Sequence, residues 1–581
     1  MRLRERLYDA RLRKNRRKLL WLFVLLLVAA ALWIYWNRPP KVDMAAYVPA
    51  ESLAFLEADD LPALANRISR TEAWRALAAP LGAPERLVPQ PWLISLARWT
   101  GIGSAESVLL ARSQFALCFM QAQATESGNT LTIKPIAALI IETHTSQRRM
   151  QPTIEKYVEQ FARRAYGTEV SAVRKNVDGV ELVEWSAADA TRKLVLTTID
   201  TVAIVGNEES VVTLCVGVHL GKHRSLADDS QLDSMRRQVA GAQPDVLAFV
   251  PKAGVKAVIH AWALSRAGNS SQATAIAPLL SNTFGNLFDG FAWTSRFDDA
   301  GAEDHCLVAL APGVGQQIPS IASAEPFGTP NVPFAPRDAT SVTLYKLSNP
   351  QSFWRELNAV ISSHSDVVGA IAARPLLNGL LQPYGISDAD AFFAAIGPHL
   401  QIIRLESSTP AVLVAETLDK QALRKLAEQR VGTNAKVENL ARAEMMVSAT
   451  DNWSAAFVDN YFLTGPDDAV RHCLEANARG ELLTAVGSFR RAQSLVDLSL
   501  PIFSLSFADD KASAISFVEL FSKEERSAFS TNAAAIQQGA ASLEYSASVT
   551  TVKNATFEWT SRSSFGLLGS LLTTFAPEKS R

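Results

Sequence analysis

A basic segment followed by an apolar run at the N-terminus constrains this chain more than any other feature of its sequence. Residues 1–18 hold nine Lys and Arg against two acidic residues, and residues 19–36 carry no charged side chain. As a helix these 18 residues rise about 27 Å, close to the thickness of a bilayer's hydrocarbon core. Trp21 and Trp36 mark the two ends, where indole rings favour the headgroup zone. The pattern predicts one transmembrane helix over 19–36, after a cytoplasmic basic tail over 1–18.

The charge distribution sets the expected orientation. Only Arg38 and Lys41 lie just beyond the apolar run, so the positive-inside rule places the N-terminus in the cytoplasm. A cleaved signal peptide is the competing interpretation, but the only cluster of small residues, 29–31, lies inside the run. We therefore expect an uncleaved signal-anchor, with the ectodomain on the opposite side of the membrane from the basic tail.

Composition limits what the ectodomain can be. Without residues 1–18 the chain has 48 basic and 56 acidic residues, a net charge of −8 that disfavours nucleic acid as a partner. No second segment of about 20 apolar residues follows, so a single-pass protein is expected. The four cysteines are too few for a disulfide scaffold and form no C-x-x-C, which leaves buried thiols as the default and one disulfide as an open alternative: Cys118, Cys215, Cys306 and Cys473.

The same order of features occurs twice, which predicts an internal repeat. Modules over 46–311 and 337–563 flank a segment, 312–336, with six prolines and three glycines that is typical of a linker. Each module opens with a short strand and a helix that has a polar cap and an early proline: Asp60 with Pro62, and Asn349 with Pro350.

Later features of the two modules also correspond. A strand and a helix ended by glycine follow in each, at Gly167 and Gly432. Next comes a strand that runs into an acidic helix start, at 206–209 and 465–468, where carboxylates complement the helix dipole. Each module closes with a strand that contains Trp-Thr-Ser-Arg, at 293–296 and 559–562. We predict an α+β fold: one N-terminal transmembrane helix, then two similar modules of mostly antiparallel sheet with packed helices.

The C-terminal segment, 564–581, is amphipathic. Its apolar residues Phe565, Leu568, Leu572 and Phe575 recur at helical spacing over a run too short to cross a bilayer. We expect this segment to dock on the second module, with the membrane surface or a partner as the alternatives.

The chain resembles a family of bacterial membrane-anchored envelope proteins defined only as a domain of unknown function. The resemblance lies in the anchor followed by 47–52, in 59–62, and in the turns at 206–209 and 225–229, mainly within the first module. It implies a membrane-anchored envelope protein and brings no catalytic residues with it.

A search for catalytic or metal-binding patterns returns little. The best metal candidate is Cys215, His219 and His223, at i, i+4 and i+8 of one expected helix, but this helix should end near 217–221 and move His223 off the face. His144, His260 and His305 each stand alone, which favours structural roles. The acidic pairs 59–60, 298–299 and 509–510 are adjacent in sequence, so on a strand they would point to opposite faces. No catalytic, cofactor-binding or metal residue is assigned.

Tryptophans could line a glycan groove, although most of them occur in apolar, periodic settings that favour core packing. Trp92 and Trp99 are the exceptions, because 89–92 is typical of an exposed loop. Together the features favour a non-enzymatic, membrane-anchored protein that binds or scaffolds an envelope protein or glycan. An envelope hydrolase with dispersed active-site residues and a carrier of apolar ligands are the alternatives.

Overall fold

The computed structural model describes residues 39–581 except 89, 128–129, 168, 178, 190, 240–243, 267–269, 318–325, 366–373, 407–409, 433, 523–531, 554–555 and 576–581, together with five residues between 24 and 35. The basic tail over 1–18 and most of the expected anchor over 19–36 therefore lie outside the described residues. Among the helices that the structure does describe, none has both the length and the apolar character needed to cross a membrane.

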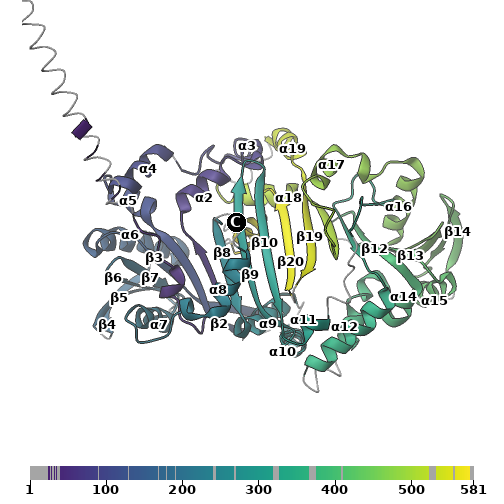
Figure 1. The fold of residues 1–581 in the computed structure, drawn as a ribbon, viewed down its shortest axis with the longest axis horizontal. Helices are drawn as coiled ribbons and strands as arrows, with labels where there is room; N and C mark the ends of the chain where they lie inside the picture. The colour runs from purple at the N-terminus through teal and green to yellow at the C-terminus, as the bar shows by residue number, and fades with distance from the viewer. Residues whose placement is uncertain are drawn as a thin grey trace, which may run out of the picture.

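The fold is α+β, with twenty described strands in one antiparallel sheet (Figure 1). The first half supplies β1 (Ala54–Ala58), β2 (Gln114–Ser127), β3 (Thr130–Glu142), β4 (Ser171–Val177), β5 (Val180–Ser186), β6 (Lys193–Ile199), β7 (Val202–Gly206), β8 (Val246–Pro251), β9 (Phe288–Asp298) and β10 (Gly301–Leu310). The second supplies β11 (Ser341–Lys346), β12 (Ile396–Arg404), β13 (Val412–Thr417), β14 (Lys436–Leu440), β15 (Ala443–Val447), β16 (Ser454–Val458), β17 (Tyr461–Gly465), β18 (Ser504–Asp509), β19 (Tyr545–Lys553) and β20 (Thr556–Ser563).

The strand pairings of the two halves correspond one to one. Across the first half the spatial order is β4-β5-β6-β7-β3-β2-β1-β8-β9-β10. Across the second it is β14-β15-β16-β17-β13-β12-β11-β18-β19-β20. Two isolated bridges correspond as well, Pro49 with Ser225 and Pro336 with Leu482.

The halves join where β10 pairs with β20, and His305 faces Thr560 at this junction. The shared tetrapeptide does not lie in corresponding strands, because residues 293–296 belong to β9 and residues 559–562 belong to β20. By pairing order the counterpart of β20 is β10. Instead, the two tetrapeptides lie on either side of β10, where Cys306 pairs with Trp293 on one edge and Trp559 on the other. The expectation that this tetrapeptide ends the same element in both modules was wrong.

Helices cover both faces of the sheet. Successive residues of one strand point to opposite faces, so they pack under different helices. In β7, Ile204 lies in a core under α7 (Glu209–His219) and α8 (Ser230–Val239), whereas Ala203 lies in a core under α6 (Gln147–Tyr166). In the second half α16 (Asp467–Arg479) and α15 (Lys420–Val431) divide the two faces in the same way.

The capping predictions are confirmed. The side chain of Asp60 accepts from the Ala63 N–H at the start of α2 (Leu61–Ile68), and Asn349 accepts from the Ser352 N–H at the start of α12 (Pro350–His364). Gly167 and Gly432 end their helices with φ of +95° and +89°. From the expected linker, Val332, Phe334 and Ala335 enter the core of the second half.

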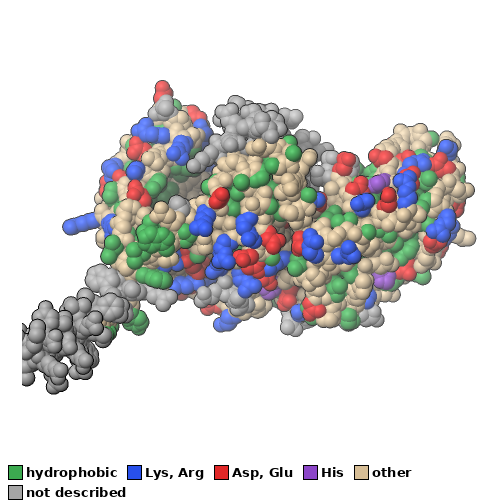
Figure 2. Space-filling view, turned by 90° about the horizontal axis from the view of Figure 1, so that it is seen from above, with side chains coloured by type: hydrophobic (Ala, Val, Ile, Leu, Met, Phe, Trp, Pro, Cys, Tyr) green, Lys and Arg blue, Asp and Glu red, His purple; other side chains and the backbone are tan. Residues whose placement is uncertain are grey.

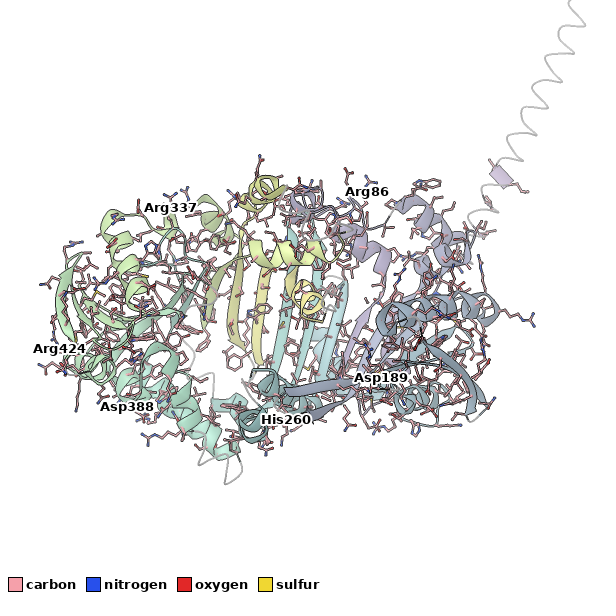
Figure 3. All side chains as sticks on the ribbon, turned by 180° about the vertical axis from the view of Figure 1, so that it is seen from behind. Arg86, Asp189, His260, Arg337, Asp388 and Arg424 are labelled. Carbon is pink, nitrogen blue, oxygen red and sulfur yellow. The ribbon has the colours of Figure 1, made fainter. Side chains whose placement is uncertain are left out.

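At the centre, one face of the sheet is covered by α3 (Glu72–Leu77) from the first half and by α18 (Lys511–Glu519), α19 (Ala533–Ala541) and α20 (Gly566–Phe575) from the second. Figure 3 shows α18 and α20 in front of the central strands, and α19 lies at the upper end of these strands, beside α3. Phe565 and Leu568 are buried there, so the C-terminal segment docks as expected, although it contacts β9 and β10 as well as α18.

Candidate functional site

The proposed metal ligands do not converge. Cys215 is buried in α7 with its Sγ 3.9 Å from that of Cys118 on β2. The Nε2 of His219 lies 3.3 Å from Asp200. The helix ends at His219, and His223 folds back over Gly217 after the turn. In the part of the chain that the structure describes, no three His, Cys, Asp or Glu side chains are grouped to hold a metal.

The single histidines lie in separate places. His305 is in β10, His260 is in α9 (Lys252–Arg266), and His144 follows β3. The Nε2 of His144 lies 3.1 Å from Gln114 Oε1, and burial lowers the pKa of this imidazole.

Glu142, beside His144, is the centre of a buried hydrogen-bond cluster. Its Oε2 accepts from the Tyr47 hydroxyl at 2.8 Å and from the Thr201 hydroxyl at 3.0 Å, and its Oε1 accepts from the His144 backbone N–H. Burial, together with this neighbouring carboxylate, raises the pKa of Tyr47. Since Tyr47 lies in the segment that follows the expected anchor, the cluster ties this segment to the sheet.

A partly open cavity of about 170 Å³, lined by both polar and apolar side chains, lies between the centre of the sheet and helices α18 and α20. This space could hold on the order of ten water molecules. Six serines from four elements line it: Ser513 of α18, Ser546 and Ser548 of β19, Ser561 and Ser563 of β20, and Ser570 of α20. The ring of Trp559 and the carboxyl groups of Asp304 and Asp510 complete the polar part of the wall.

Asp304 in β10 is held by donors from three directions. Its Oδ1 accepts from the indole N–H of Trp293 at 2.9 Å, and its Oδ2 accepts from the backbone N–H of Leu567 at 2.9 Å. Ser561 Oγ lies 3.4 Å from the same Oδ2. The residue is 1% exposed, and burial raises the pKa of its carboxyl even though these donors act to lower it.

Asp510 approaches the cavity from the start of α18. Its Oδ2 accepts from the backbone N–H of Ser564 at 2.5 Å, and burial raises its pKa to about 6. The two aspartates therefore hold residues 564 and 567 of one turn between β20 and α20. Within this turn Gly566 has φ +63°, and a Cβ there would lie 2.5 Å from Asp304 Oδ2. Only glycine allows the turn to pass this close to the carboxyl group.

Chemically the cavity offers hydroxyl groups that donate and accept, carboxyl oxygens that accept, and apolar contacts that include the aromatic side chains of Trp559 and Phe565. The sequence analysis assigned no site here, because the adjacent residues 509 and 510 were expected to point to opposite faces of a strand. One sequence signal for a polar surface was available. Serines occupy alternate positions of two strands, 546 and 548 in one and 561 and 563 in the other, and alternate residues share a face of the sheet.

The remaining acidic pairs serve local structure. Asp59 pairs with Lys41 and Asp60 with Arg98, while Asp298 pairs with Arg562 and Asp299 with Arg70. Trp185, Trp293, Trp354 and Trp453 are buried as expected. Trp92 and Trp99 are exposed as expected, but both lie in helix α4 (Pro91–Thr100) and not in a loop. Proline at the first helical position and a glycine cap with φ +70° at Gly101 explain this helix.

Comparison of the chain with models of protein families, with curated proteins and with solved structures finds no match.

Proposed function

We propose that this chain is a single-pass envelope protein, anchored in a bacterial inner membrane by 19–36, whose periplasmic ectodomain binds a small hydroxyl-rich ligand such as the end of a glycan. The serine- and aspartate-lined cavity at the junction of the two halves carries the ligand assignment. The proposed membrane topology rests on the basic tail and the apolar run.

We also propose that the two halves arose by duplication of one unit. The support is the one-to-one correspondence of strand pairings, including the bridges of Pro49 and Pro336. Antiparallel pairing of β10 with β20 suits this origin, because two equivalent edge strands facing each other are related by an approximate two-fold axis. This axis would pass between His305 and Thr560, which pair with each other across the junction. Joining the edges also removes two exposed strand edges, which otherwise promote aggregation.

A glycan suits the cavity for reasons of chemistry. Sugar hydroxyls donate to carboxyl oxygens and exchange hydrogen bonds with serines, and a sugar ring packs its C–H face on an indole. A basic side chain is missing from the described lining, so an anionic ligand would find no counter-charge there.

Two experiments test the proposal. A reporter that is active only in the periplasm, fused after Arg581, should be active, and activity of a cytoplasm-only reporter would contradict the topology. For the ligand, the melting temperature of the full-length protein should rise with neutral sugars such as glucose or N-acetylglucosamine. Ser548→Trp should fill the cavity and abolish the rise, and equal shifts in both proteins would contradict the assignment.

A hydrolase that acts on the same ligand is the second candidate, because a carboxyl group with a pKa of about 6 can exchange protons near neutral pH. Asp510 would be the proton-transfer group and Asp304 its partner. This candidate predicts turnover that Asp510→Asn abolishes while ligand binding persists. The binding proposal predicts no turnover in either protein.

A further inference from the structure

Helix α4 presents most of its apolar side chains to solvent. Trp92 is 65% exposed, Trp99 47% and Leu96 44%. At 100° per residue these three side chains fall within about 60° of one another on one face of the helix. Ile102, just beyond the Gly101 cap, is also exposed. We call Trp92, Leu96, Trp99 and Ile102 the α4 face.

This helix is held in place mainly by polar contacts, and it buries few of its apolar side chains. Ala97 is its only buried residue, and it packs on Val108 and Ala111 of α5 (Ala105–Arg112). The Nε of Arg98 donates to the Ala111 carbonyl at 2.6 Å, and the Nε of Arg112 donates to the Arg98 carbonyl at 3.0 Å. The helix is therefore fixed by its arginine side, and the apolar face is left without a partner among the residues that the structure describes.

The N-terminal segment enters the fold beside this helix. Lys41 pairs with Asp59, and Val42 exchanges two backbone hydrogen bonds of 2.9 Å with the side chain of Gln114, the residue that begins β2. Asp60, next to Asp59, pairs with Arg98 of α4. Figure 2 shows hydrophobic side chains gathered at the end of the molecule where the described chain begins.

The length of chain before this point limits how far α4 can lie from a membrane. Only four residues lie between Trp36, the last of the apolar run, and Lys41, and the five residue steps from Trp36 to Lys41 span at most about 17 Å. The headgroup zone fills several ångströms of that distance, since it accounts for the ~10–15 Å by which a bilayer exceeds its hydrocarbon core.

We propose that the α4 face inserts into the interfacial zone of the phospholipid bilayer that anchors the chain, and so fixes the orientation of the ectodomain on the membrane. This inference rests on the anchor of the proposed function. Indole rings favour this zone, and an amphipathic helix lying in it buries its apolar face by about 5–10 Å. Trp92 and Trp99 would be the anchoring side chains, with Leu96 between them.

The second half of the chain supports this choice of occupant. The corresponding region, between β11 and β12, places its described Trp and Phe side chains largely inside the fold: Trp354, Phe392 and Phe393 are all buried. That half lies away from residue 39, where the continuously described chain begins (Figure 1). Exposed tryptophans thus occur in the half that the anchor holds at the membrane, as a lipid contact requires.

The test places a fluorescent probe on the α4 face of the full-length protein. Leu96→Cys is labelled with an environment-sensitive dye, and Val437→Cys on β14 is the control, because Val437 is an exposed apolar residue of the other half. The four native cysteines are buried and should not react in the folded protein. Each protein is placed, one copy per disc, in nanodiscs of phosphatidylethanolamine and phosphatidylglycerol that contain doxyl-labelled quencher lipids.

We expect the probe at 96 to lose about half of its emission to the quencher lipids, because a face inserted 5–10 Å lies at the depth of the doxyl group. The probe at 437 should lose little. Adding Trp92→Ser and Trp99→Ser to the Leu96→Cys protein should return quenching at 96 to the level at 437.

Equal quenching at 96 and 437 in discs that carry the protein overturns the lipid contact and leaves the anchor intact. A blue-shifted probe at 96 without quenching would mean that a protein surface covers the face, which also overturns it. Failure of the full-length protein to enter discs contradicts the anchor itself, so the two proposals fail in distinguishable ways.

Discussion

The carboxyl group of Asp304 joins the indole of Trp293 to the first turn of α20, with one oxygen accepting from each. Both contacts measure 2.9 Å, and one of them spans 263 residues of the chain. Asp304 and Trp293 are 1% and 2% exposed, so loss of this carboxyl group would leave a buried indole N–H without its hydrogen bond.

Asp304→Asn should destabilise the protein by about 2–3 kcal/mol, since an amide has one oxygen and must leave one of the two N–H groups unsatisfied. Chemical denaturation of the full-length protein in detergent measures the change. Glu303→Gln, on the opposite face of β10 and paired with Arg296 and Arg562, is the control and should cost about 0.5 kcal/mol or less. Equal losses for both variants would mean that the cluster around Asp304 contributes little.

The buried carboxyl group of Asp510 should make the protein less stable as the pH rises. Burial raises the pKa of this carboxyl from 3.8 to about 6 in the folded protein. Between these two values the folded state binds the proton more tightly than the unfolded state, so this group's contribution to stability is complete below pH 4 and is lost as the pH rises through 6. The melting temperature of the wild type relative to Asp510→Asn should therefore fall between pH 4 and pH 7.

Asp459→Asn, at an exposed turn, controls for the loss of one negative charge. A wild-type advantage over Asp510→Asn that grows between pH 4 and pH 7 would contradict the predicted direction.

Local signals in the sequence predicted local structure well. Asp60 and Asn349 cap helices because their side chains satisfy N–H groups that any helix start leaves open. The end of α7 was expected near Gly217–Gly221 because glycine favours helix ends, and the helix ends at His219. The α+β class and the antiparallel sheet were also expected from the mixture of strand and helix patterns, whereas helix α4 was expected to begin in a loop.

Relationships between distant segments were not predictable in this way. Pairing of β10 with β20 joins strands that lie about 250 residues apart in the sequence, and nothing in either strand specifies the other as its neighbour. The cavity draws Asp304 from one half and its serines from the other, so the alternating serines of β19 and β20 indicate a polar strand face but not the residues that meet it. The Trp-Thr-Ser-Arg identity led to a wrong equivalence because four residues do not specify a position in a sheet, whereas the pairing order does.

Cys118 and Cys215 should form a disulfide if the ectodomain is periplasmic. Their sulfurs are 3.9 Å apart, and a bond requires closure to about 2.05 Å by small movements of β2 and α7. The two thiols would lose two protons and two electrons to a dithiol oxidase of that compartment. Mass spectrometry of protein from membranes, with free thiols blocked before unfolding, should find these two linked and Cys306 and Cys473 free.

Cys306 and Cys473 provide the internal control, because both are buried and their sulfurs have no cysteine contact among the described residues. Four free thiols in protein isolated without reductant would contradict the disulfide. Linkage of Cys306 to Cys473 would show that the sample had unfolded before blocking.

Arg236 on α8 fastens the segment that follows the anchor to the sheet. Its guanidinium contacts Asp43 at 2.9 Å and Glu57 at 3.0 Å, and burial raises the pKa of Glu57 to about 7 against the opposing effect of Arg236. Arg236→Met leaves Glu57 without its partner in a buried setting, which should cost about 2–4 kcal/mol. Arg237→Met, an exposed neighbour on the same helix, should have little effect.

Adding Glu57→Gln to Arg236→Met should recover part of the loss, because an unpaired amide is less costly to bury than an unpaired carboxylate. Denaturation of the wild type, of Arg236→Met, of Glu57→Gln and of the double variant at pH 8, where Glu57 would be charged, measures the coupling between the two side chains. Additive losses in the double variant would mean that Glu57 and Arg236 act independently. In that case the remaining contacts, from Tyr47 to Glu142 and from Val42 to Gln114, hold the segment in place.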